Sequence, residues 1–98
     1  MNKDDFFSSF KPRTEVYDLP DGQSIEISEL TLEQRGKLHE AAKKNPIDAQ
    51  ALIVCMACSL FDESDMDAVK GLAGDLVTGI ASAVLAASGL ADEEAEKN

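Results

Sequence analysis

The sequence predicts a mostly α-helical protein, a small bundle of about four helices preceded by an N-terminal β-hairpin. Three observations favour this fold class. The chain has 98 residues, enough for one domain but not for two. Apolar residues recur at helical spacing through much of the chain after Thr31. The turn sequence Pro20-Asp21-Gly22 lies between two short segments of alternating apolar and polar residues.

We expect three parts along the chain: a flexible arm over 1–13, a single helical domain over 14–90 and an acidic tail over 91–98. The arm has no sustained periodicity, yet it holds three of the four phenylalanines. Aromatic side chains on such an arm indicate docking, either onto another chain or as a strap over the domain's own core. Both interpretations stay open for Phe6, Phe7 and Phe10.

The hairpin is the clearest local signal. Proline presets the backbone of the first turn position, and Gly22 suits the left-handed position of a three-residue loop. The resulting register pairs Tyr17 with Ile25 and Leu19 with Gln23. An isolated hairpin is marginally stable, so its apolar face should rest on helices. One face carries Tyr17, Leu19, Ile25 and Ile27, and the other Asp18, Ser24 and Glu26.

Two helices should follow the hairpin. Thr31 and Gln34 have the spacing of a capping box, which predicts a first helix from Thr31 to Lys44. Pro46 then begins a second helix that ends near Phe61 and is apolar nearly all round, as expected for the centre of a bundle. The first helix has a narrow apolar stripe of Leu38, Ala41 and Ala42.

An acidic segment, 62–65, should cap a short third helix from Met66 to about Ala73. It does not match a calcium-binding loop, which needs glycine and glutamate where the chain has Asp67 and Ala73. A fourth helix ending near Gly89 follows from the spacing of Leu72, Leu76, Ile80, Val84 and Ala87. Its other side carries Asp75, Thr78, Gly79, Ser82 and Ala86, which fits either close packing within the chain or self-association.

The charge balance excludes several classes of partner. The chain has nine basic and nineteen acidic residues, which gives a net charge of −10. Nucleic acids and anionic membrane surfaces bind proteins largely through lysine and arginine, so neither is expected as a partner. We find no secretory signal and no apolar run of the roughly 20 residues that a membrane span needs. A cytoplasmic protein is expected.

Catalytic and metal-binding patterns are missing from the sequence. His39 is the only histidine, so zinc would lack ligands, and no glycine-rich phosphate loop or nucleophile elbow occurs. Cys55 and Cys58 lie inside an apolar helical run, which favours buried, reduced thiols over a redox pair. We therefore expect no enzyme activity, cofactor or metal, and we expect function through protein binding. The candidate partner-binding residues are Phe6, Phe7, Phe10, Gly79, Ser82 and Ala86.

The order of these features resembles the tail assembly chaperones of long-tailed (siphovirus-type) bacteriophages. The resemblance covers 15–98. It rests on the hairpin at Leu19-Pro20-Asp21-Gly22, the helix start at Glu29-Leu30-Thr31, and the buried helix that ends at Leu60-Phe61-Asp62. It continues through an acidic turn and a Leu/Ala-rich helix that closes on Ser88-Gly89-Leu90.

The resemblance implies a non-catalytic factor of the infected host's cytoplasm that is absent from the mature virion. Such chaperones bind the tape-measure protein, keep it soluble and assist polymerisation of the tail-tube protein, and self-association into a homo-oligomer is expected. Two alternatives come from the residues alone. One is an acidic interaction module, such as an antitoxin-like inhibitor or a mimic of DNA charge. The other is a thiol enzyme that uses Cys55 and Cys58.

Overall fold

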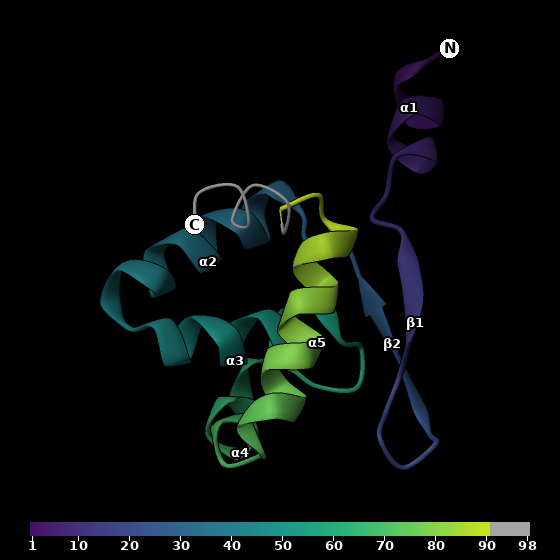
Figure 1. Ribbon diagram of the computed structural model, residues 1–98. Helices are drawn as coiled ribbons and strands as arrows, with labels where there is room; N and C mark the ends of the chain where they lie inside the picture. Colours follow the sequence, from purple (N-terminus) through teal and green to yellow (C-terminus); the bar gives the residue numbers. More distant parts are fainter. Residues whose placement is uncertain (91–98) are drawn as a thin grey trace.

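The computed structural model describes residues 1–90, and the expected acidic tail, 91–98, lies outside the described residues. The mostly helical fold class with an N-terminal hairpin is confirmed. Figure 1 shows α3 beside α2, with α5 crossing them, α4 at one end and the hairpin on the far side of α5. The elements are α1 (Lys3–Ser9), β1 (Thr14–Asp18), β2 (Ser24–Ser28), α2 (Leu32–Lys44), α3 (Pro46–Ala57), the 3₁₀ turn η1 (Glu63–Asp65), α4 (Met66–Lys70) and α5 (Gly74–Ala87).

The hairpin has the predicted register. Tyr17 pairs with Ile25, and the Leu19 amide donates to the Gln23 carbonyl at 2.7 Å. Gly22 has φ +89°, the left-handed conformation that this turn requires. The apolar face rests on the helices as expected, since Ile27 is buried and forms an antiparallel bridge with Cys58.

The predicted capping box is present at the start of α2. The Gln34 amide donates to Thr31 Oγ1 at 3.1 Å, and the Thr31 amide donates to Gln34 Oε1 at 2.9 Å. Asn45 ends α2 and caps α3, with Pro46 in the first turn. In the predicted apolar stripe of α2, Leu38 and Ala41 are partly buried, but Ala42 is exposed.

The other helix boundaries differ from the prediction. The second predicted helix ends at Ala57 and not near Phe61, because Cys58 turns into the extended conformation to pair with Ile27. The third helix ends at Lys70 and follows a 3₁₀ turn capped by Asp62. The fourth begins at Gly74, so Leu72 lies before it and is exposed.

The arm also differs from the prediction of an irregular segment. Residues Lys3–Ser9 form α1, capped by Asn2, whose side chain accepts a hydrogen bond from the Asp5 amide at 2.8 Å. No residue of α1 is buried. In Figure 1 it extends past the end of β1, away from the other helices. The arm therefore does not form a strap over the domain's own core.

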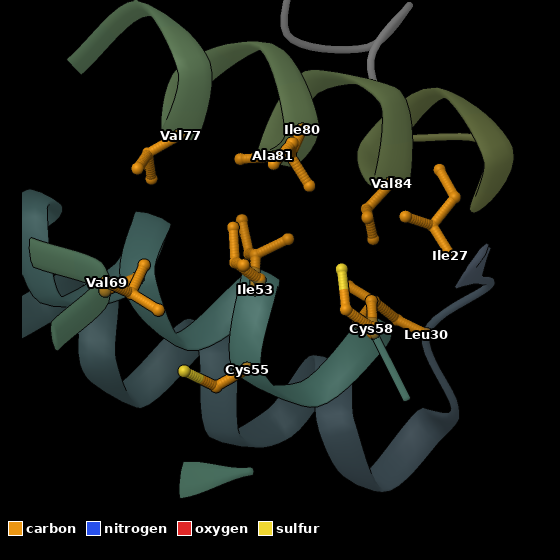
Figure 2. Close-up of a cluster of buried hydrophobic side chains, with 13 residues drawn as sticks. Ile27, Leu30, Ile53, Cys55, Cys58, Val69, Val77, Ile80, Ala81 and Val84 are labelled. Carbon is orange, nitrogen blue, oxygen red and sulfur yellow. The ribbon is translucent and has the colours of Figure 1, made fainter. Parts of the chain in front are cut away.

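One core joins the hairpin to the helices. Val54, Val69 and Val84 are almost fully buried, and Ile27 of β2 lies in the same cluster. Figure 2 shows α5 presenting Val77, Ile80, Ala81 and Val84 toward Ile53 of α3. Only 5% of the residues are aromatic, and the buried core is built mainly from aliphatic side chains. No helix within residues 1–90 combines the length and the apolar character that crossing a bilayer requires.

Candidate functional site

A partly enclosed groove for a partner lies between α2, α3 and α5 and has a volume of about 430 Å³. We call it the α2–α5 groove. It forms because α2 and α3 join through the short Asn45-Pro46 connection and diverge, while α5 crosses both (Figure 1). Its apolar lining comprises Leu38, Ala42, Pro46, Ala49, Ile53, Ala81 and Leu85, and its polar lining Gln50, Thr78 and Ser82.

Polar groups lie at one end of the α2–α5 groove. Thr78 Oγ1 donates to Gln50 Oε1 at 3.1 Å, which links α5 to α3. The remaining walls are aliphatic, so the groove suits an apolar side chain or a narrow helix face with a few polar groups at its edge. The lining holds no charged side chain and no histidine or cysteine.

A second concavity, of about 550 Å³, lies on another side of α2. It is larger but shallower, and charges of both signs line it: Lys37, Lys44, Glu40, Asp48 and Glu63. Lys37 Nζ lies 3.4 Å from Glu63 Oε1, and such exposed ion pairs are well solvated. The α2–α5 groove is therefore the better candidate for apolar recognition.

The second candidate surface is the phenylalanine ridge, the side chains of Phe6, Phe7 and Phe10 on α1. Their exposed fractions are 51%, 63% and 69%. The Phe6 ring centroid lies 5.9 Å from that of Phe7 and 5.0 Å from that of Phe10. Exposed aromatic rings grouped in this way are typical of a protein-binding surface.

The three candidates on α5 lie along one side of the helix but have different surroundings. A Cβ atom on Gly79 would lie 2.6 Å from the Tyr17 hydroxyl, so Gly79 is packed against the chain's own hairpin. Ser82 lines the α2–α5 groove, and Ala86 is exposed. At Gly79 the structure therefore shows close packing within the chain, and Gly79→Leu would disturb that packing whatever its effect on self-association.

The sequence did not single out the groove as a site. Leu38 and Ala42 were recognised as an apolar stripe, but their partners Pro46 and Leu85 belong to other elements. The angle between α2 and α3 creates the groove, and no motif encodes that angle. Ala42 is the one residue in the sequence that could have pointed to the groove. It is apolar and belongs to the same stripe as Leu38, but it is not part of the buried core.

The two cysteines are free and buried. Figure 2 shows the Cys58 sulfur directed toward α5 and the Cys55 sulfur directed away from it. Burial raises the pKa of the Cys58 thiol to about 11, and Cys55 adds to this effect. Burial also raises the pKa of Cys55, helped by the carboxylates of Asp65, Asp62 and Glu63. Raised values disfavour the thiolate that redox or nucleophilic chemistry needs.

Within residues 1–90, histidine, cysteine and carboxylate side chains do not gather in threes at a spacing that would hold a metal ion. The candidate site thus consists of two apolar surfaces, the α2–α5 groove and the phenylalanine ridge, on an acidic domain. No family model, curated protein or solved structure matches the chain.

Proposed function

We propose that this protein is a non-catalytic tail assembly chaperone that binds apolar helical segments of a tape-measure protein before tail-tube subunits cover them. The α2–α5 groove is the observation that carries the proposal, because it combines mostly aliphatic walls with a volume of about 430 Å³, and amphipathic helices bind through apolar grooves. The resemblance in the order of sequence features supports the identity of the client.

The charge of the chain supports this role. A net charge of −10 keeps a protein soluble at the high concentration that a stoichiometric chaperone needs. A long tape measure exposes apolar stripes that aggregate until they are covered. An acidic holder with a shallow apolar groove would delay that aggregation and release the client to tube subunits.

The test is co-expression with the tape-measure protein. We expect it to be a very long, helical protein whose gene lies near the gene for this chain. We expect the wild-type chain to co-purify with it and to keep it in the soluble fraction. Ala42→Trp fills the groove and should abolish both effects. Ala68→Trp, a matched change at an exposed position of α4 outside the groove, should leave them intact.

The result that contradicts the proposal is capture of the client by the Ala42→Trp variant as strongly as by the wild-type chain. The alternative, an acidic inhibitor of a basic partner, predicts a different pattern. Its binding would weaken steeply with salt and would not depend on Ala42. A salt titration of the purified complex separates the two functions.

A further inference from the structure

The backbone of β1 has hydrogen-bonding groups that the hairpin does not use. The Leu19 amide donates to the Gln23 carbonyl at 2.7 Å, at one end of the hairpin. The Glu29 amide donates to the Arg13 carbonyl at 2.9 Å, at the other end. Such bonds recur at every second residue of an antiparallel pair, so the odd-numbered residues of β1 bond to β2. The amides and carbonyls that point away from β2 belong to Thr14, Val16 and Asp18.

β1 is the free edge of the two-stranded sheet. β2 has a neighbour on each side, because it pairs with β1 and Ile27 bridges to Cys58. Among residues 1–90, no backbone group bonds to the outward amides of β1. Figure 1 shows the hairpin on the far side of α5 from α2 and α3. An exposed strand edge of this kind is a template for a strand of another chain.

The residues on either side of Val16 are complementary to one another. A two-fold axis through Val16 brings β1 against a second β1 in antiparallel orientation, with all outward residues paired. Thr14 then faces Asp18 of the other copy, which sets a hydroxyl donor against a carboxylate. On the other face Glu15 is opposite the uncharged Tyr17. The acidic residues of β1 therefore do not face one another, although the chain has a net charge of −10.

Two prolines restrict the pairing to this register. Pro12 and Pro20 lie at equal distances in sequence from Val16, one on each side of β1. Proline has no amide to donate, so neither position extends the ladder. Moving the axis to Glu15 would set two carboxylates directly against each other, and moving it toward Pro20 would set a strand residue opposite that proline. Prolines commonly protect strand edges, but these two lie outside the strand and leave its outward amides free.

Val16 is the apolar centre of this edge. Its side chain is 70% exposed and lies between two polar residues of the same face, Thr14 and Asp18. β-Branched side chains favour strands and pair well across them. About the two-fold axis the two Val16 side chains lie opposite each other, so each gives the other the apolar neighbour that it lacks.

We propose that two copies of this chain pair through their β1 strands, antiparallel about an axis at Val16, and so form one continuous four-stranded sheet. The outward residues of each copy donate and accept, which gives up to about six backbone hydrogen bonds between the copies. Such a contact is small for a protein interface, so the dimer should dissociate on dilution. The α2–α5 groove takes no part, and the pairing does not rest on the proposed function.

The mass in solution tests the pairing. Light scattering over a concentration series should show the wild-type mass rising toward twice that of the monomer. Val16→Pro removes the central outward amide, which the hairpin does not use, so it should stay monomeric with an unchanged circular dichroism spectrum. Val16→Lys sets two ammonium groups against each other and should also stay monomeric. Ser24→Lys adds the same charge to the same face of β2 and should still dimerise. A wild-type monomer at every concentration would overturn the proposal.

Exchanging two residues tests the register. Thr14→Asp sets carboxylates against Asp18 at both ends of the contact, and we expect it to weaken the dimer roughly tenfold. Adding Asp18→Thr restores a hydroxyl opposite each carboxylate and should restore the affinity. Within the hairpin both positions face a serine, Ser28 and Ser24, so the exchange leaves the intrachain pairs matched. Equal affinities for all three chains would contradict this register.

A cross-linking experiment tests which residues meet. Thr14→Cys in one tagged chain and Asp18→Cys in a differently tagged chain are mixed and treated with a short bis-maleimide. We expect a cross-linked pair in the mixture and little in either variant alone, because identical positions of the two copies lie about 14 Å apart along the strands. The native thiols are buried and should not react. Cross-links that form equally in a single variant would overturn the antiparallel arrangement.

The outcomes separate this inference from the proposed function. Ala42→Trp should lose the client and remain a dimer, whereas Val16→Pro should lose the dimer and keep the client. A wild-type monomer that captures the client refutes the pairing only, and an edge-paired dimer that binds no tape-measure segment refutes the chaperone role only. The phenylalanine ridge supplies the last control. If replacing its three residues with serine gives a monomer while Val16→Pro stays dimeric, the ridge joins the copies and the proposal is overturned.

Discussion

At the scale of single residues, Ser88 connects three segments. Its hydroxyl accepts a hydrogen bond from the Leu30 amide at 2.9 Å, and its carbonyl accepts one from Arg35 Nη2 at 2.6 Å. Ser88 is the one polar residue in the described chain that is classed as buried. It ties the end of α5 to the connection between β2 and α2, so it holds one end of the α2–α5 groove together.

Ser88→Ala should therefore destabilise the fold. The buried Leu30 amide would lose its acceptor, which costs about 1–3 kcal/mol. Ser82→Ala, on the exposed side of the same helix, should change stability by less than about 0.5 kcal/mol. Urea unfolding of both variants measures the difference, and equal stabilities would show that the Ser88 hydrogen bond contributes nothing.

Because of Cys58, the free energy of unfolding should depend on pH above about pH 9.0. Its pKa rises from 9.0 to about 11 on folding, so the folded state holds the proton more tightly than the unfolded state. This contribution is fully present below pH 9.0 and is lost as pH rises toward 11. Cys58→Ala should make the alkaline decline less steep, while truncation in the core costs about 1–3 kcal/mol at neutral pH. Thermal melts across this range test both effects, and an unchanged slope would contradict the first.

At the scale of elements, the contact between β1 and α5 depends on a missing side chain. A Cβ atom added to Gly79 would lie 2.6 Å from the Tyr17 hydroxyl oxygen and 3.8 Å from Cζ of the same ring. Glycine is otherwise unfavourable inside a helix. Its presence at this point of α5 lets the hairpin approach the helix closely.

Gly79→Ala should have opposite effects in two backgrounds. In the wild-type chain the new methyl group meets the Tyr17 hydroxyl, and the displacement should cost on the order of 1 kcal/mol. In a Tyr17→Phe background that atom is gone, and the better helix propensity of alanine should add up to about 1 kcal/mol. A double-mutant cycle by chemical denaturation checks the reversal. The same sign in both backgrounds would show that the contact is not strained.

Some helix boundaries could be predicted from nearby residues, and others could not. Thr31 and Gln34 specify the start of α2 through hydrogen bonds to each other. At the next boundary the Asn45 side chain accepts a hydrogen bond from the Ile47 amide, and Pro46 presets the first turn of α3. The predicted boundaries at both places are confirmed. The end of α3 was predicted wrongly because Cys58 is helical by pattern but pairs with Ile27, which lies 31 positions earlier. A partner that distant leaves no periodic signal.

At the scale of the whole molecule, the hairpin and the helices share one core, which includes Ile27 of β2 and Val84 of α5. A continuous core should unfold as a unit, although an isolated hairpin would be only marginally stable. The described part of the chain therefore behaves as one domain with α1 outside it.

We expect the fluorescence of Tyr17, in β1, and the far-ultraviolet dichroism of the helices to report the same midpoint in urea. Amide hydrogens of α1 should exchange rapidly, because no residue of this helix is buried. An early transition of Tyr17 fluorescence would show that the hairpin is an independent unit.

Sequence alone was enough to predict the fold class, the hairpin register, the capping box of α2, the start of α3 at Pro46 and the apolar interior of α3, because each depends on neighbours within a few positions. The sequence also marked the three phenylalanines as candidate docking residues, but it left open whether they cover the chain's own core, and the structure shows that they are exposed. The position of the α2–α5 groove and the close approach of Tyr17 to Gly79 could not be predicted and emerge from the tertiary packing. The physical reason is that these features depend on the angles at which helices cross, and those angles follow from the packing of side chains distant in sequence.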